Sequence, residues 1–198
     1  IDKPNGFDEA VHLEFHSPYG ASKGSADQYM LDFSRIYGLK TAVFRHSSMF
    51  GGRQFATADQ GWLGWFTQKA VEIKNGTAKE PFTISGNGKQ VRDLLYASDC
   101  VALYLKAAEK IEDIKGQAFN IGGGVIKSIE EVVLMLIKKI NSNIKVEYLD
   151  KDFPEITHQY LDSSKITNTT NWKPKTKFDA GIDLAINFYK KYYKNDKD

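Results

Sequence analysis

Helix-like and strand-like segments alternate along this 198-residue chain, and the alternation limits the available folds more than any other feature. Apolar side chains recur in residues 21–37 at the three- and four-residue spacing of one buried helical face. Gly38 supplies a helix stop, and residues 39–46 then form a short β-prone run. A helix followed by a strand is the unit of α/β proteins, so we predict an α/β fold. The apolar stripe of the first helix consists of Ala26, Tyr29, Met30, Phe33 and Tyr37.

The same alternation continues to the end of the chain. An aromatic stripe that starts at Trp62 predicts a helix ending at Gly76, and we interpret it as core rather than as a base-stacking surface. Residues 82–85 and 91–96 flank a glycine-rich loop at 86–88, which predicts a β-hairpin. The remaining predicted elements are a helix at 98–110, a strand at 117–121, a helix opened by a capping box at 128–131, a strand at 145–149, and helices at 164–169 and 179–193.

Composition excludes several classes of protein. The 41% hydrophobic and 26% charged residues suit a globular chain with one core, or one core and a small neighbour. The 27 Lys+Arg nearly cancel the 25 Asp+Glu, so we expect no nucleic-acid partner. No apolar run reaches the roughly 18 residues that span a bilayer, and no signal pattern opens the chain. We therefore expect no membrane partner and a cytoplasmic location.

Cysteines, histidines and glycines give little sign of other chemistry. Cys100 lies in an apolar run, where a buried small residue is a better interpretation than a reactive thiol. His12, His16 and His158 lack the spacing of metal ligands, so we predict no metal. The glycines at 86–88 and 122–124 lack the dinucleotide fingerprint, and we interpret both as turns rather than phosphate loops.

Tyr19 and Lys23 are the candidates for catalysis. On one helix a four-residue spacing brings the two side chains together, and a protonated lysine beside a phenol favours the phenolate, a usable base. Tyr193 and Lys197 share this spacing in a polar tail, so spacing alone is weak evidence. The surroundings distinguish the first pair: Pro18 fixes the entry to the helix, and a strand follows the helix.

Three stretches together resemble a known family. They read SPYGASKGSADQYMLDFSRIYGLKTAVFRHSSMFGGRQFATADQGWLGWF, ISGNGKQVRDLLYASD and FNIGGG. They resemble the extended short-chain dehydrogenase/reductases, and within these the NAD-dependent nucleotide-sugar epimerases that act on a CDP-linked sugar at carbon 2. The segment RHSSMFGGRQFAT favours these epimerases over the related 4,6-dehydratases.

The resemblance implies a particular architecture. The chain would hold the carboxyl-terminal part of a Rossmann-like parallel sheet and a small α/β substrate-binding domain. Residues 1–52 would belong to the NAD-binding domain and carry the catalytic helix, and residues 53–198 would form mainly the substrate-binding domain. Segments near 91–127 would pack back on the NAD-binding domain. The complete protein would be a homodimer.

The resemblance also assigns roles near the cofactor. It implies that Tyr19 removes a proton from a sugar hydroxyl while NAD accepts the hydride, which then returns to the other face of the transient ketone. Lys23 would also bind the nicotinamide ribose. His46 and Ser48 stand at the carboxyl end of a predicted strand, which in this family borders the nicotinamide. For His46 we favour a positioning role over that of a general acid.

Four further residues are expected to bind the nucleotide sugar. Gln90 and Arg92 match the part of the family that grips the diphosphate, although Arg92 could instead pair with Asp93 or Asp99. Arg53 and Gln54 follow a glycine pair where the substrate approaches, and a solvated loop arginine is the alternative for Arg53.

The family pattern is incomplete in this chain. The glycine-rich start that receives NAD and the catalytic serine or threonine before the tyrosine are absent, so we expect a fragment that is inactive by itself. Residues 152–155 read Asp-Phe-Pro-Glu where the family has an arginine and an aspartate, which would weaken nucleotide binding. A 4,6-dehydratase and a non-catalytic nucleotide-sugar-binding module remain alternatives.

Overall fold

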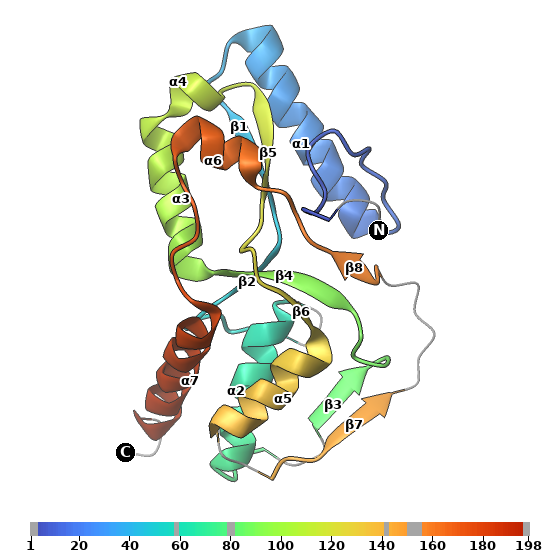
Figure 1. Cartoon of the computed structure of the whole chain (residues 1–198), viewed down its shortest axis with the longest axis vertical. Helices are drawn as coiled ribbons and strands as arrows, with labels where there is room; N and C mark the ends of the chain where they lie inside the picture. The colour runs from blue at the N-terminus through green and yellow to red at the C-terminus, as the bar shows by residue number, and fades with distance from the viewer. Residues whose placement is uncertain (1–3, 58–59, 79–81, 141–142, 150–155, 196–198) are drawn as a thin grey trace.

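The structure is a computed structural model that describes residues 4–57, 60–78, 82–140, 143–149 and 156–195 (Figure 1). The helices are α1 Pro18–Tyr37, α2 Trp62–Lys74, α3 Ala97–Glu109, α4 Ile111–Ile114, α5 Ile129–Ile140, α6 Ser164–Thr170 and α7 Phe178–Asn195. The strands are β1 Ala42–His46, β2 Ser48–Phe50, β3 Phe82–Ser85, β4 Val91–Tyr96, β5 Gln117–Ile121, β6 Ile126–Ser128, β7 Val146–Leu149 and β8 His158–Gln159. The predicted α/β class is confirmed.

Parallel pairing dominates the sheets. β1 pairs with β5, β2 with β4, β3 with β7, and β8 with β4, all in parallel, whereas β6 is antiparallel to β4. The predicted hairpin is therefore wrong, because β3 and β4 join different partners. The turn between them is present, with Gly86 and Gly88 both at positive φ. A glycine turn fixes where the chain reverses, but it does not choose the partner of either strand.

Two separate hydrophobic cores organise the described part of the chain. The α3 core lies among β4, β5, α3, α4 and α6, and it contains Leu95, Leu103, Ala107, Ile114, Phe119, Ile121, Ile166 and Trp172. The α7 core lies among α2, α5, α7 and the neighbouring strands, and it includes Phe50, Leu63, Phe66, Phe82, Leu136, Ile182 and Tyr189. Trp62 and Trp65 pack against the α7 core, so the aromatic stripe of α2 is core as predicted.

Capping residues fix the ends of two helices at the positions predicted from the sequence. The Ser17 hydroxyl accepts a hydrogen bond from Gly20 N at 3.0 Å, and Gly38 ends α1 at a φ of 68°. Ser128 and Glu131 form the predicted capping box: Ser128 N donates to Glu131 Oε2 at 2.7 Å, and Glu131 N donates to Ser128 Oγ at 3.1 Å. None of the helices in the described ranges is long and apolar enough to cross a membrane.

The prediction of a buried apolar stripe on α1 is wrong. Tyr29 is 68% exposed and Tyr37 is 70% exposed, whereas the buried residues of this helix are Gly24 and Asp27. Phe15 covers the small side of the helix, since a Cβ added to Gly24 would come within 1.9 Å of its ring. The helix thus contacts the rest of this chain mainly through small and polar residues and Met30, whereas Tyr29, Phe33 and Tyr37 of the apolar stripe are exposed.

Candidate active site

Tyr19 and Lys23 lie in the first turns of α1. Lys23 Nζ is 5.5 Å from the centroid of the Tyr19 ring, so the two side chains meet as their spacing predicts. Tyr19 is 60% exposed and Lys23 is also exposed. A phenol and an ammonium group are therefore placed together on an open surface, where both can reach a bound molecule.

The first turns of α1, which carry this pair, point towards the carboxyl end of β1, because α1 and β1 run antiparallel (Figure 1). Thr41 Oγ1 donates to Met30 O at 2.7 Å, and Arg45 Nε donates to Asp27 Oδ2 at 2.6 Å, so the helix and the strand run in opposite directions. Sequence reasoning missed Asp27 and Arg45. The available signal was a carboxylate next to the apolar stripe of the predicted helix and an arginine inside a β-prone run.

His46 ends β1 and is held by Tyr104 of α3. The two rings stack with centroids 5.7 Å apart, and His46 Nε2 is 3.0 Å from Tyr104 Oη. Burial lowers the pKa of His46 below its ordinary value of 6.5, so the imidazole is neutral at neutral pH. A neutral, stacked ring suits positioning better than proton donation.

Two buried polar atoms beside each other in sequence lack hydrogen-bond partners among the described residues. They are His46 Nδ1 and the hydroxyl of Ser47, whose residue is 8% exposed. Buried polar groups in folded proteins are nearly always paired, so these atoms indicate a place that another molecule completes. Ser48 differs, because its Oγ lies 3.5 Å from Trp62 Nε1.

Arg53 and Gln54 follow β2 on a tightly constrained loop. Arg53 has a φ of 64°, the left-handed region that residues other than glycine rarely adopt, and its side chain is exposed. The Gln54 side chain donates from Nε2 to Met49 O at 3.2 Å. Its Oε1 is buried, with no hydrogen-bond partner in the part of the chain that the structure describes.

Gln90 and Arg92 lie at the start of β4. The buried Arg92 donates from Nη1 to the carbonyls of Val91 and Ile156, both at 2.9 Å. The Gln90 carbonyl accepts a hydrogen bond from Ile129 N. The β2–β4 pairing aligns Ser48 with Leu94, two residues from Arg92, so β4 brings these residues towards the end of β1. The segment 152–155, whose sequence differs from the family pattern, lies outside the described residues.

Asp93 connects the elements around the site, which the sequence did not reveal. It is 1% exposed, and its carboxylate accepts from Gly123 N at 2.9 Å and from Leu161 N at 3.3 Å. Burial raises the pKa of Asp93 while these backbone donors oppose the rise. Asp99 accepts from Thr176 N at 2.9 Å. The glycines at 122–124 form a turn, as predicted, with Gly124 at a φ of 69°.

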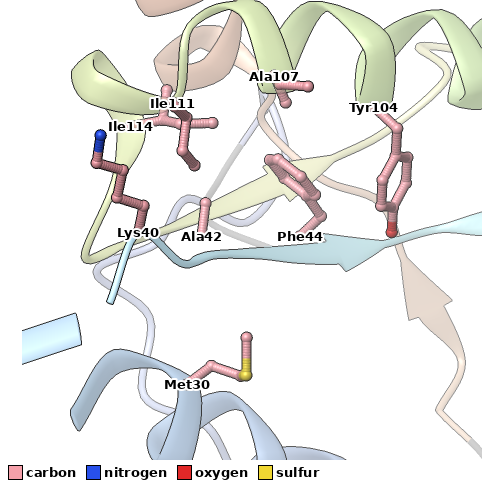
Figure 2. A pocket seen from close by; sticks show the side chains of 9 residues that line it. Met30, Lys40, Ala42, Phe44, Tyr104, Ala107, Ile111 and Ile114 are labelled. Carbon is pink, nitrogen blue, oxygen red and sulfur yellow. The ribbon is translucent and has the colours of Figure 1, made fainter. Parts of the chain in front are cut away.

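An apolar pocket of about 340 Å³ is lined by residues of α1, β1, α3 and α4, including Tyr104 (Figure 2). Met30 of α1 faces Ala107 and Ile111 across it, with Phe44 of β1 between them (Figure 2). None of the predicted site residues lines this pocket.

The residues at the end of β1 fit a nicotinamide dinucleotide in their chemistry. The unpartnered atoms of His46 and Ser47 offer a hydrogen-bonding site, and Tyr19 and Lys23 offer exposed donors for ribose hydroxyls. No group of three or more His, Cys, Asp or Glu that could hold a metal occurs in the described ranges.

Known proteins similar to this chain are named as epimerases or dehydratases of nucleotide-linked sugars. The chain is 55% identical over 184 residues to CDP-paratose 2-epimerase of Salmonella typhi, covering 92% of this chain and 54% of that protein. It is 30% identical over 174 residues to a putative UDP-glucose 4-epimerase of Methanocaldococcus jannaschii, covering 88% of this chain and 53% of that one. The chain thus spans about half the length of these relatives.

Solved structures agree in fold. UDP-glucose 4-epimerase of Thermotoga maritima, solved with UDP-glucose, superposes with a TM-score of 0.81 at 28% identity, covering 91% of this chain and 55% of that one. The dTDP-glucose 4,6-dehydratase of Bacillus anthracis, solved with NAD, gives 0.82 at 26% identity, covering 96% and 57%. The profile of the NAD dependent epimerase/dehydratase family matches residues 2–122, well over half of the chain. The chain belongs to the NAD dependent epimerase/dehydratase family.

Proposed function

We propose that the protein containing this chain is an NAD-dependent epimerase that inverts carbon 2 of CDP-paratose to give CDP-tyvelose. The observation that carries the proposal is the exposed Tyr19–Lys23 pair at the start of α1, in a chain 55% identical to a CDP-paratose 2-epimerase. Other relatives of this chain are named for UDP-glucose and dTDP-glucose. The choice of a CDP-linked sugar therefore depends on the 55% identity to CDP-paratose 2-epimerase. We also propose that the protein is cytoplasmic and that its product is a sugar donor for O-antigen synthesis.

The residues of this chain have distinct tasks in this reaction. Tyr19 removes the proton from the sugar hydroxyl and later returns it, while Lys23, next to the Tyr19 ring, supports this transfer and binds ribose hydroxyls. Bound NAD supplies reversible acceptance of a hydride. His46, Ser47 and Ser48 orient the cofactor at the end of β1. Arg53, Gln54, Gln90 and Arg92 bind the nucleotide sugar.

The two cores support the predicted division of the chain into a cofactor-binding part and a substrate-binding part. Residues 1–52 would serve the cofactor, and residues 53–198 mainly the substrate. Leu95, Leu103 and Phe119, from the segment 91–127, lie in the α3 core, against which Ala42 and Phe44 of β1 also pack. This packing supports the expectation that the segment returns to the cofactor-binding part. The exposed apolar stripe of α1 supports a homodimer formed through this helix.

The test uses the full-length protein with CDP-paratose and NAD. NMR should show inversion at carbon 2, and Tyr19→Phe should lower kcat by at least about 100-fold, the usual contribution of a proton-transfer group. Tyr37→Phe, at the far end of α1 and 70% exposed, is the matched control and should keep wild-type activity.

Other outcomes would redirect the assignment. Elimination of water instead of inversion would favour a 4,6-dehydratase, to which this chain is also 30% identical. CDP-sugar binding without turnover and without copurified NAD would favour a non-catalytic module.

A further inference from the structure

The loop that carries Arg53 and Gln54 is fastened to the last helix of the chain. Tyr189 of α7 is fully buried, and its hydroxyl donates to Gln54 O at 2.5 Å across 135 residues of sequence. Burial raises the pKa of Tyr189 to about 12, so the hydroxyl stays a donor throughout the neutral range. This hydrogen bond is part-buried, and a carbonyl that loses its donor away from water is left unsatisfied, so the contact constrains the main chain at Gln54.

Contacts on either side of Gln54 strengthen the attachment. Gly52 lies against Phe188, because a Cβ added to Gly52 would come within 2.8 Å of Phe188 Cβ. On the other side, the ring of Phe55 packs against three rings of α7, with centroids 6.1 Å from Phe188, 6.4 Å from Tyr189 and 5.0 Å from Tyr192. The loop is therefore held by α7 at Gly52, Gln54 and Phe55.

The loop conformation needs such support. Arg53 has a φ of 64°, and a left-handed residue other than glycine persists only where its surroundings over-determine it. The amide of Gln54 fits against the first turn of α2, since a Cβ on Gly64 would lie 2.5 Å from Gln54 Oε1. That oxygen is buried and has no hydrogen-bond partner among the residues described. A small shift of the loop would move both side chains.

We infer that Tyr189 is a positioning residue for nucleotide-sugar binding: its hydroxyl fixes the main chain of Gln54 and thereby orients Arg53 and Gln54 towards the substrate. The inference rests on the proposed function, in which these two side chains bind the nucleotide sugar. It gives the last helix of the chain a role in substrate affinity, although α7 contributes no predicted site residue.

The experiment compares two tyrosines one helical turn apart in the full-length protein. Tyr189→Phe removes only the hydroxyl that reaches Gln54. Tyr193→Phe removes a similar hydrogen bond, from Tyr193 Oη to Glu72 Oε1 at 2.6 Å, which does not touch the loop. We expect Tyr189→Phe to raise the KM for CDP-paratose and the Kd for CDP about tenfold, with kcat within about twofold of wild type. Tyr193→Phe should leave both constants unchanged.

Hydrogen exchange provides a readout independent of turnover. Backbone amides of residues 52–57 should exchange faster in Tyr189→Phe than in wild type or Tyr193→Phe. In a Gln54→Ala background, Tyr189→Phe should raise KM by less than it does alone. If Tyr189→Phe does not fold, Phe55→Leu tests the same contact from its exposed side and should raise KM while kcat is kept.

The outcomes separate the inference from the proposed function. Equal KM values for Tyr189→Phe and wild type, in an active protein, overturn the inference alone. So does an equal rise in Tyr193→Phe, which would show a general effect of weakening α7. A wild-type protein that binds no CDP overturns the proposed function, and the inference with it.

Discussion

Arg45 and Asp27 form a bidentate ion pair that joins β1 to α1. Arg45 Nε donates to Asp27 Oδ2 at 2.6 Å, and Nη2 donates to Oδ1 at 3.1 Å. The side chains are 20% and 7% exposed, so the pair is largely shielded from water. It lies on the buried side of α1, one helical turn beyond Lys23, and so fixes the helix that carries the proposed catalytic pair, Tyr19 and Lys23.

Removal of Asp27 should destabilise the protein strongly. Asp27→Ala leaves the Arg45 charge largely buried without its carboxylate, which costs about 3 kcal/mol of unfolding free energy. Asp32→Ala on the same helix is the control, because its pair with Arg35 is 60% to 72% exposed and should be worth less than about 1 kcal/mol. Urea denaturation measures both, and equal losses would contradict the importance given to the buried pair.

A methyl group at Gly123 should not be tolerated. A Cβ there would lie 1.7 Å from Leu94 O, and because that atom belongs to the backbone of β4, the strand itself would have to move. We expect Gly123→Ala to cost about 2 to 3 kcal/mol. Gly20→Ala is the control: its Cβ would meet Ser17 Oγ at 3.4 Å, an ordinary contact, and alanine favours the helix. Thermal unfolding should separate the two variants, and a loss of stability in both would refute the steric explanation.

Acid should destabilise the protein through His46. Because burial lowers the folded-state pKa of His46 below 6.5, the unfolded chain binds a proton more readily than the folded one. The unfolding free energy should therefore be unaffected by this group above about pH 6.5 and should fall as the pH drops below that value. Urea denaturation at pH 7.5 and 5.5 should show a smaller difference for His46→Gln than for wild type. The same difference in both would assign the acid sensitivity to other groups.

The apolar stripe of α1 should hold the proposed homodimer together. Ile36 is 63% exposed next to Tyr37 at the end of this stripe, and a charge there would have to be buried in the interface. Ile36→Glu should turn the full-length dimer into a monomer in sedimentation velocity. Leu184→Glu on α7, at a residue 53% exposed and away from the stripe, should leave the dimer intact. A dimer that survives Ile36→Glu would place the interface elsewhere.

Local sequence patterns predict most of the long helices and strands and several of their ends. Ser17 and Gly38 bound α1, Ser128 and Glu131 cap α5, and residues 117–121 form β5 as predicted. These features depend on interactions within a few residues of the chain, which leave a readable local pattern. The Tyr19–Lys23 contact belongs to the same class, because four residues along a helix already bring two side chains together.

Which segments meet became clear from the folded chain alone. It paired β3 with β7 rather than β4, turned the apolar stripe of α1 outward, and brought Asp27 to Arg45 and Tyr189 to Gln54. The physical reason is that strand partners, buried ion pairs and long-range hydrogen bonds depend on which surfaces the whole chain can cover. That choice is set by burial summed over many distant residues, and no short stretch of sequence contains it.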